Sequence, residues 1–518
     1  MAVNARHPLY EDQLNNWKLL GHCHEGEAAV KAEGETYLPP TSGHVADGMG
    51  EGQPGLKAYE AYLARAVFPD DVRESVEGLV GIMHIKPPKQ MNVPTVLEEP
   101  INNITSDNED ALTLLRRVNA AQLTKGRIGL LVEVPDGVTG DAVPFIATYS
   151  AESIINWTTG PSKYGRDEPD VIVLDESGNE QQSDLSWKYV ESYRVLATGA
   201  ALERLLGARP EGVPAGDVYV VSTGSTLDLA SRTWIAPQIK GRTFERIPFV
   251  FINVQDLAPD PDRPPLLGLA NRCLAIYRAE ADYRHSLFMQ SQETLVILGD
   301  QELDPDSDKD ETRIGAGAII RISNPDGDVK YVGVSGAGLA EQGKALQADY
   351  DKAAQLGLKL LDGGEGGGSQ QSGEALRIRV AARTASLSSI ARAGVAGLAQ
   401  AVKYVAEWMG ASPDDVEFEA NTDYAANQMT GEDLSKLVAA KTMGAPISWE
   451  TIHSLMRNGK LTEKTYEEEL DLIADEEPAG GVDARGNPLG DPNADPNDPN
   501  ADPNAPPEDD NPDDDPNA

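Results

Sequence analysis

The sequence predicts an α+β protein in which a mixed first half is followed by long helices. Three observations lead to this prediction. Short apolar runs bounded by Pro, Gly and Asp occur between about residues 127 and 254, which is typical of strands. Apolar residues then recur at helical spacing over segments much longer than an average helix. The final residues, about forty of them, repeat Asp-Pro-Asn and indicate a disordered acidic tail.

The composition limits the classes of function. The chain has 518 residues, enough for about two to four domains, and a formal net charge of −40. Such a protein lacks the surplus of Lys and Arg that grips phosphates, so any encounter with DNA occurs without tight electrostatic binding. Its two cysteines, Cys23 and Cys273, imply no disulfide framework and favour a cytosolic origin. The first residues lack an apolar signal core and no apolar run approaches the roughly 18 residues of a membrane span, so we expect neither secretion by that route nor membrane insertion.

The first half should contain helices and then strands. Residues 1–115 are mostly helical in pattern, with breaks at Pro and Gly. The segment GLKAYEAYLARAVF shows one helical face, formed by Leu56, Tyr59, Tyr62, Leu63 and Ala66. Strands are expected in RIGLLVEVP, PFIATYSAESIINW, DVIVLDE, DVYVVSTG and RIPFVFINV.

Three long helices are expected in the second half. The first covers residues 266–292 and would be about 40 Å long, with the apolar stripe Leu266, Ala270, Leu274, Tyr277, Ala281 and Phe288. The second covers about residues 337–361. The third covers about 376–409, with the stripe Leu387, Ile390, Ala391, Val395, Leu398, Val402, Val405 and Met409. Between the first two, residues 293–335 hold β-like runs on either side of NPDG, which indicates a hairpin.

Short elements should close the fold. Ser412, followed by Pro413, has the signature of a helix N-cap with proline in the first position. DVEFEA is strand-like, and helices are expected in TGEDLSKLVAAKTMG, SWETIHSLMRNG and TEKTYEEELDLIADEE. Thr465 and Glu468 have the spacing of a capping box. The acidic tail is expected to be either simply solvated or an arm that binds a partner.

The motif most like that of an enzyme is GLAEQGKA, residues 338–345. It matches the nucleotide-binding pattern G-x-x-x-x-G-K-[ST] except at the end, where Ala345 lacks the hydroxyl that binds Mg²⁺. The competing interpretation is that these residues open the second long helix. An NTPase therefore remains only an alternative.

Other candidate sites are incomplete. The carboxylates from Asp304 to Glu311 alternate as in a calcium loop, but Lys309 and Gly315 replace the Gly and Glu that an EF-hand requires. The triplet HCH at residues 22–24 has no fourth ligand at a zinc-like spacing. We therefore expect no enzymatic activity, no catalytic residue, no cofactor and no metal.

A Gly-rich, acidic segment joins the second and third long helices. LLDGGEGGGSQQSGEALRI contains six glycines and three carboxylates, and its first cation is Arg377. Glycine gives a backbone unusual conformational freedom. From the residues alone, the segment is either an ordinary flexible linker or a functional loop.

The order of these elements resembles that of tailed-bacteriophage portal proteins, the ring at the unique capsid vertex through which DNA enters and leaves. The resemblance is to a portal family long described as of unknown function. It is carried by GRIGLLVEVP, PFIATYSAESIINW, PPLLGLANRCLAIYRAEADYRHSLFMQ, SGEALRI, APISWETIHSLMRNGKL and GETYLPP. It covers nearly the whole chain except the Asp-Pro-Asn tail, and its specificity lies in the order of the segments.

The resemblance implies a portal fold with an α/β wing, two long stem helices, a small β-containing clip, a long wing helix and a helical crown. The implied division is 1–265 wing, 266–292 first stem helix, 293–335 clip, 336–361 second stem helix, 362–375 tunnel loop, 376–419 long wing helix and strand, 420–476 crown and 477–518 disordered tail.

The resemblance also implies location and partners. Copies would form a ring in the virion, of about twelve subunits, assembled in the host cytoplasm and closed by a heterologous interface. The implied partners are the terminase large subunit, the major capsid protein, head-completion or neck proteins and, as a further candidate, the scaffold. Double-stranded DNA would pass through without sequence recognition, and no membrane would be involved. Besides the packaging NTPase, a capsid-associated adaptor without a channel remains an alternative.

The acidic segment acquires a physical role in such a ring. Because each Lys or Arg on a phosphate adds affinity, a channel through which DNA slides should carry few of them. The implied tunnel-loop residues, whose carboxylates would repel the duplex, are Asp362, Gly363, Gly364, Glu365, Gly366, Gly367, Gly368 and Glu374. Arg377 and Arg379 could contact DNA or pair with neighbouring carboxylates, and the sequence leaves both readings open.

Overall fold

The computed structural model describes residues 2–134, 143–161, 167–239, 241–290, 294–298, 328–332, 337–358, 373–422, 424, 431–458, 461–462 and 464–475. The chain divides into two compact units, Met1–Tyr424 and Ala425–Ala518. Helices and antiparallel sheets both contribute to the first unit, which confirms the predicted α+β class. Among the helices of the described residues, none has both the length and the apolar character needed to cross a bilayer.

The amino-terminal region is helical, as predicted. Its helices are α1 (Pro8–Glu25), α2 (Glu27–Ala32), α3 (Ser42–Ala46), α4 (Pro54–Arg65), α5 (Asp71–Met83) and α6 (Ala111–Lys125), with 3-10 turns at Gly34–Thr36, Thr95–Leu97 and Pro100–Asn103. Local signals fix their ends. Asp110 accepts a hydrogen bond from the Thr113 amide at 2.6 Å as the N-cap of α6, and Gly126 ends that helix with a left-handed φ of 72°.

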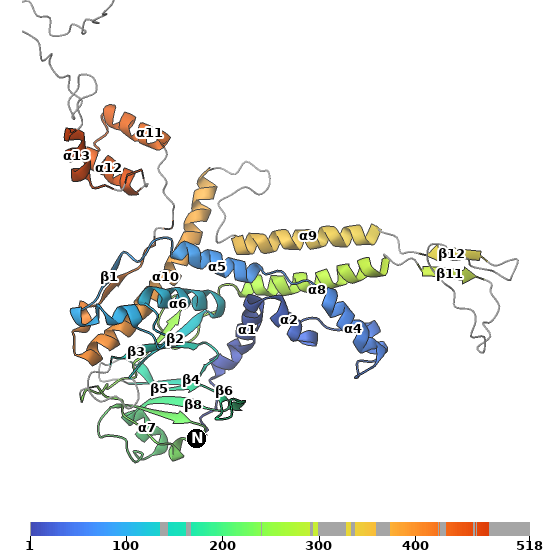
Figure 1. The fold of residues 1–518 in the computed structure, drawn as a ribbon, viewed down its shortest axis with the longest axis horizontal. Helices are drawn as coiled ribbons and strands as arrows, with labels where there is room; N and C mark the ends of the chain where they lie inside the picture. The colour runs from blue at the N-terminus through green and yellow to red at the C-terminus, as the bar shows by residue number, and fades with distance from the viewer. Residues whose placement is uncertain are drawn as a thin grey trace, which may run out of the picture. The chain divides into compact units, whose positions relative to one another are not determined.

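Two antiparallel sheets form the body of the first unit (Figure 1). One has the order β10 (Phe249–Asn253), β2 (Arg127–Glu133), β3 (Phe145–Ser150). The other has the order β4 (Ile154–Pro161), β5 (Asp167–Asp175), β8 (Tyr193–Thr198), β9 (Tyr219–Gly224). Every predicted strand segment of this region is present. The sequence patterns missed β8, the helix α7 (Gly199–Leu206) and the hairpin of β6 (Gly178–Gln181) and β7 (Trp187–Val190).

The second half of the unit contains three long helices. They are α8 (Leu267–Gln290), α9 (Ala337–Leu358) and α10 (Gly373–Met409), close to the predicted ranges. Between α8 and α9, β11 (Thr294–Leu298) pairs antiparallel with β12 (Asp328–Val332). The predicted NPDG turn, the carboxylates from Asp304 to Glu311 and the tail after residue 475 lie outside the described residues.

The apolar residues of the first unit form two clusters. The sheet core contains the two sheets, most of α6 and the carboxyl-terminal half of α10, from Val395 to Trp408. The helical core contains residues of α1, α2, α4, α5, α8 and α9, together with Leu387, Ile390 and Ala391 of α10. The predicted α10 stripe is buried from Leu387 to Val405, while Met409 is half-buried. The helix α10 therefore joins the two cores.

The remaining predicted elements are also present. Ser412 accepts a hydrogen bond from the Asp414 amide at 3.2 Å and caps a 3-10 turn that starts with Pro413. The strand β13 (Glu417–Glu419) pairs with β1 (Gln90–Asn92). The second unit holds α11 (Gly431–Thr442), α12 (Trp449–Asn458) and α13 (Tyr466–Asp475).

Candidate functional site

The helices α8 and α9 lie side by side in opposite directions (Figure 1). Near the start of α8, Nη1 of Arg272 lies 3.1 Å from Oδ1 of Asp349, which is in the second half of α9. Near the other end of the pair, a β-carbon built on Gly343 would lie 3.4 Å from the Tyr283 hydroxyl oxygen. The strands β11 and β12 follow and precede these helices at that same end. The arrangement is therefore an α-helical hairpin that carries a two-stranded sheet.

The helix α8 is anchored to the amino-terminal helices through polar and apolar contacts. Its Tyr277 and Ala281 side chains are fully buried. The Tyr62 hydroxyl of α4 donates to Asp282 at 2.6 Å, and Nε of Arg278 donates to the Tyr37 carbonyl at 2.7 Å. Burial, followed by the Asp282 carboxylate, raises the pKa of Tyr62, so the hydroxyl keeps its proton and remains a donor. These contacts hold α8, and with it the helical hairpin, against the amino-terminal helices.

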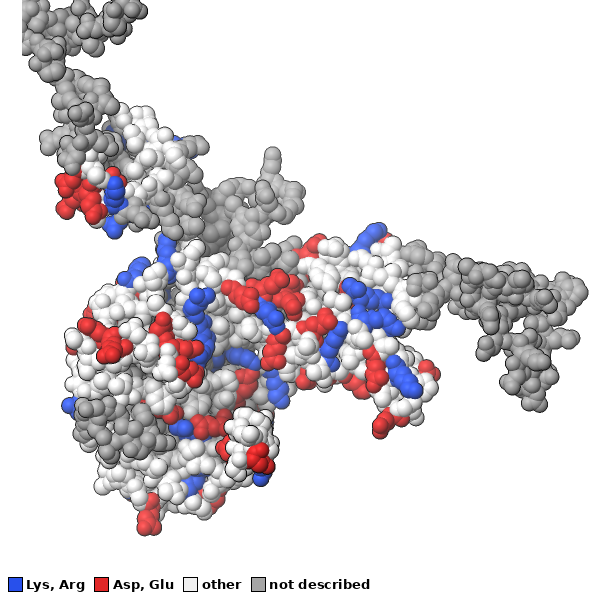
Figure 2. All heavy atoms as spheres, viewed as in Figure 1, with Lys and Arg blue, Asp and Glu red and all other residues white. Residues whose placement is uncertain are grey.

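The helix α9 is much more exposed. Among its described side chains only Leu346 and Ala353 are buried. The exposed side chains carry both signs of charge, including Glu341, Lys344 and Lys352. Figure 2 likewise shows both signs mixed over the displayed face of the molecule. A helix that buries so little against its own chain has a large surface available for another macromolecule.

The predicted tunnel-loop residues Asp362, Gly363, Gly364, Glu365, Gly366, Gly367 and Gly368 lie outside the described residues. The helix α10 begins at Gly373, three residues before the expected start at 376. Glu374, predicted to belong to the loop, is therefore in the first turn of the helix. Arg377 and Arg379 lie in the following turn, as predicted for the third long helix. The side chains of these three residues lie outside the described part of the structure.

A chain of polar groups, buried at Asn119 and Gln122, holds α10 where it passes between the two cores. Nε2 of His84 lies 2.9 Å from Oδ1 of Asn119, and Nδ2 of Asn119 donates to Oε1 of Gln122 at 2.8 Å. Nε2 of Gln122 donates to the Asn253 carbonyl at 2.6 Å and to the Ile390 carbonyl at 3.2 Å. These bonds connect His84, the residue that follows α5, with α6, β10 and α10. Sequence patterns did not indicate this chain of bonds.

Close approach of α10 depends on two glycines. A β-carbon on Gly394 would lie 2.5 Å from Nδ2 of Asn119, and one on Gly397 would lie 2.4 Å from side-chain carbons of Ile252. Neither distance is compatible with an unshifted side chain. The helix that follows the predicted tunnel loop is thus seated directly on α6 and β10.

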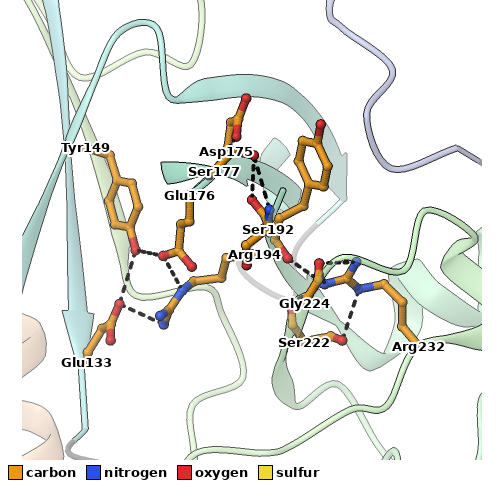
Figure 3. Close-up of polar contacts among 11 residues, drawn as sticks. Glu133, Tyr149, Asp175, Glu176, Ser177, Ser192, Arg194, Ser222, Gly224 and Arg232 are labelled. Carbon is orange, nitrogen blue, oxygen red and sulfur yellow. Dashed lines mark hydrogen bonds and ion pairs between the residues drawn. The ribbon is translucent and has the colours of Figure 1, made fainter. Parts of the chain in front are cut away.

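A second polar cluster links the two sheets (Figure 3). Arg194 of β8 places Nη1 2.8 Å from Oε1 of Glu133 and Nε 2.7 Å from Oε1 of Glu176. The Tyr149 hydroxyl donates to Glu176 at 2.6 Å. Burial raises the pKa of Glu133. For Arg194, burial by itself would lower the pKa, but the interactions with Tyr149, Glu133 and Glu176 outweigh burial, so the pKa of Arg194 is raised. The cluster therefore stabilises the contact between the two sheets, because the guanidinium of Arg194 lies between the carboxylates of Glu133 and Glu176.

The nucleotide-binding-like segment 338–345 forms the first turns of α9. A phosphate-binding loop directs several backbone amides toward the phosphates, whereas amides beyond the first helical turn bond within the helix. The side chain of Lys344 donates to Glu341 at 2.7 Å. This geometry differs from the loop that the sequence pattern would require.

The HCH triplet lies on α1. Nδ1 of His22 is 2.9 Å from the Tyr37 hydroxyl, and Cys23 is fully buried in the helical core, where burial raises its pKa to about 12. Burial, together with Arg73 and Lys125, lowers the pKa of His24. Within the described ranges, no three His, Cys, Asp or Glu side chains gather as metal ligands would.

Residues 265–409, from just before α8 to the end of α10, match the family described as "Domain of unknown function (DUF4055)". No curated protein matches the chain. Three solved structures are similar to this chain. A chain of "Virion of native gene transfer agent (GTA) particle" is 13% identical over 74% of this chain and 89% of that chain, with a TM-score of 0.36. For "Neck of empty GTA particle computed with C6 symmetry" the identity is 12%, the coverage 75% of this chain and 90% of that chain, and the TM-score 0.37, and for "Neck of native GTA particle computed with C12 symmetry" the identity is 12%, the coverage 74% and 89%, and the TM-score 0.34. At these TM-scores the similarity supports no statement about function.

Proposed function

We propose that this protein is the portal protein of a tailed bacteriophage. Identical copies form a ring at one capsid vertex, and double-stranded DNA is packaged and ejected through its channel. The observation that carries the proposal is the order and pairing of α8, β11, β12 and α9, followed by the Gly-rich acidic segment and α10. It corresponds to the stem, clip, stem, tunnel loop and wing helix that the sequence resemblance implies.

The exposure of α9 supports assembly into a ring. A 22-residue helix with two buried residues among its described side chains gains little from its own chain. In a ring, the neighbouring copy would cover part of the exposed surface. Because the covering surface differs from the covered one, the contact is heterologous and closes by rotation. Twelve copies are the number that the resemblance implies.

The charge of the protein suits a conduit rather than a DNA-binding protein. With a net charge of −40, the chain offers DNA few cationic partners for its phosphates. The acidic tunnel loop, at 362–375 by sequence, would face the lumen and keep the duplex from adhering. The proposed partners are the terminase large subunit at the clip, the major capsid protein around the wing, neck proteins and, during assembly, the scaffold. The protein would perform no chemistry of its own.

Electron microscopy of the purified full-length protein tests the proposal. We expect rings with a central hole and a rotational symmetry near twelve. Particles without a hole would contradict a channel, and a monomer both in solution and in the virion would contradict the ring. A nucleotide-binding assay on the same preparation addresses the NTPase alternative, since measurable ATP affinity would favour it.

A further inference from the structure

The second unit buries very little of its own apolar surface. Over its described residues, 431–458, 461–462 and 464–475, Ile452 is the single apolar side chain among those that are buried. Seven large apolar side chains are exposed, namely Met443, Trp449, Leu455, Leu461, Leu470, Leu472 and Ile473. Ordering a residue costs about 1–2 kcal/mol of backbone entropy, which so small a core does not offset. A second surface that covers these side chains would supply the missing burial.

The exposed residues form two faces that differ in charge: one is flanked by carboxylates only, and the other carries Lys441 and Arg457 besides Glu450. On α13, Leu470 and Ile473 are 42% and 43% exposed and lie on one side of the helix, flanked by Glu467 and Glu469. We call this the acidic-apolar face. The helix carries further carboxylates and no Lys or Arg.

The other face is formed by α11, α12 and the residues between them. Met443 is 82% exposed and Trp449 is 51% exposed. Nζ of Lys441 lies 4.5 Å from the centre of the Trp449 ring, and the exposed Arg457 follows on α12. We call these four residues the basic-apolar face.

From these two faces we infer that the acidic-apolar face of one copy packs on the basic-apolar face of the next copy. The charges select this contact among the alternatives. Two copies of α13 packed symmetrically would bring Glu467 and Glu469 toward like charges, which repel one another. A contact between unlike faces pairs carboxylates with Lys441 and Arg457 and also buries both apolar surfaces. Such a contact is heterologous and repeats from copy to copy.

The inference adds a specific contact between neighbouring copies to the proposed ring. It rests on the proposed function, because the repeated contact must close into that ring. It assigns the crown an interface of its own, made by residues that the first unit does not contribute. The exposed apolar surface would then be covered only after assembly.

Cross-linking of the full-length protein tests the contact. Two single variants, Met443→Cys and Glu467→Cys, are coexpressed, the first with a size tag, and treated with a short bismaleimide. The native Cys23 and Cys273 are both fully buried and should not react in the folded protein. We expect a cross-linked dimer with one tagged and one untagged chain, and a ladder of longer products from the double variant.

The control pairs Glu467→Cys with Thr451→Cys, an exposed position two residues after Trp449 and therefore on the opposite side of α12. This pair should give no mixed dimer, and an equal yield would contradict the assigned face. Strong cross-linking of Glu467→Cys to itself would overturn the inference in favour of a symmetric contact. Electron microscopy of the same sample separates the two proposals: rings without mixed dimers overturn only this inference, whereas mixed dimers without rings overturn the proposed channel.

Discussion

Gly397 of α10 lies so close to Ile252 of β10 that a β-carbon on the glycine would stand 2.4 Å from the isoleucine side chain. Ile252 is fully buried, so it cannot move aside without disturbing the sheet core. Gly397→Ala should therefore destabilise the first unit. Overpacking typically costs about 1–3 kcal/mol, which exceeds the helix-propensity gain of about 1 kcal/mol or less. Denaturant titration of the purified protein measures the difference.

Gly81 provides the matched control. It lies in α5, where a β-carbon would have no neighbouring atom within 4 Å. Gly81→Ala should leave the free energy of unfolding unchanged or raise it by about 1 kcal/mol, because the substitution causes no overpacking and alanine has the higher helix propensity. Equal stability of the two variants would contradict the close packing of α10 on β10.

The buried amide of Gln122 should be more important for stability than its size suggests. Gln122→Met keeps a similar volume but removes the donor to the Asn253 and Ile390 carbonyls and the acceptor for Asn119. Each buried polar group left without a partner costs about 1–3 kcal/mol. We expect a loss in this range or above it in the free energy of unfolding. Gln347→Met, at an exposed position of α9, should change it by less than about 0.5 kcal/mol. A Gln122→Met protein as stable as this control would disprove the role of the amide.

Acid should weaken the first unit through His84. Burial lowers the pKa of His84 below its ordinary 6.5, although the hydrogen bond to Asn119 opposes this effect. The folded state therefore favours the neutral ring, and the resulting stability is present above pH 6.5 and is lost as the pH falls through the lower folded-state pKa. In His84→Gln, the decrease in unfolding free energy between about pH 7 and pH 5 should be smaller than in the wild type.

The comparison of the two proteins isolates this residue. His24 and His285 also have pKa values lowered by burial and contribute the same sign of pH dependence in both proteins. Their effect cancels in the difference between the two curves. Parallel curves over this pH range would show that His84 does not couple protonation to folding.

Local patterns predicted the elements well where one periodicity was sustained. The α10 stripe from Leu387 to Val405 repeats over many turns, so helix and buried face could both be inferred. The capping box of α13 is present in both directions: the Thr465 amide donates to Glu468 at 2.7 Å and the Glu468 amide donates to the Thr465 hydroxyl at 3.2 Å. Such signals are short-range, because they depend only on residues that are close to one another in the sequence.

The strand β8 and the polar clusters could not be inferred in the same way. Thr198 is both the last residue of β8 and the N-cap of α7, so no loop separates the strand YRVLAT from the helix and its alternating pattern is too short to stand out. Arg194 forms ion pairs with Glu133 and Glu176, and Tyr149 donates to Glu176, although these residues come from separate parts of the chain. Their pairing follows from the order of strands in the sheets, which local spacing does not encode. The early start of α10 was missed because Gly373 looked like part of the loop.

Thr465→Ala should loosen the first turn of α13. The substitution removes the hydroxyl that accepts from the Glu468 amide, a loss typically worth about 1 kcal/mol. Hydrogen exchange of residues 466–470 should become faster, with little change in α11. Thr442→Ala, which removes a bond to a carbonyl near the end of α11, should not affect α13. Unchanged exchange at α13 would mean that packing, rather than the cap, orders this helix.

The proposed channel predicts a specific effect of charge in the tunnel loop. The double variant Asp362→Lys, Glu365→Lys replaces two carboxylates with ammonium groups at the position implied to face DNA. Rings should form normally, because the change lies in the segment between α9 and α10 and leaves both helices intact. DNA packaging in an assay with assembled procapsids should become slower or stall.

The dependence on salt distinguishes this mechanism from a general defect. Each new Lys that contacts a phosphate adds a counterion-release term, so the retarding attraction weakens as salt rises. The packaging rate of the double variant should therefore recover toward that of the wild type with increasing salt concentration. A second double variant, Asp12→Lys, Glu51→Lys, makes the same charge change at exposed positions of the amino-terminal region and should package normally. If both variants were slowed equally, or if the tunnel-loop variant packaged at the normal rate at low salt, the loop would not act on DNA through its charge.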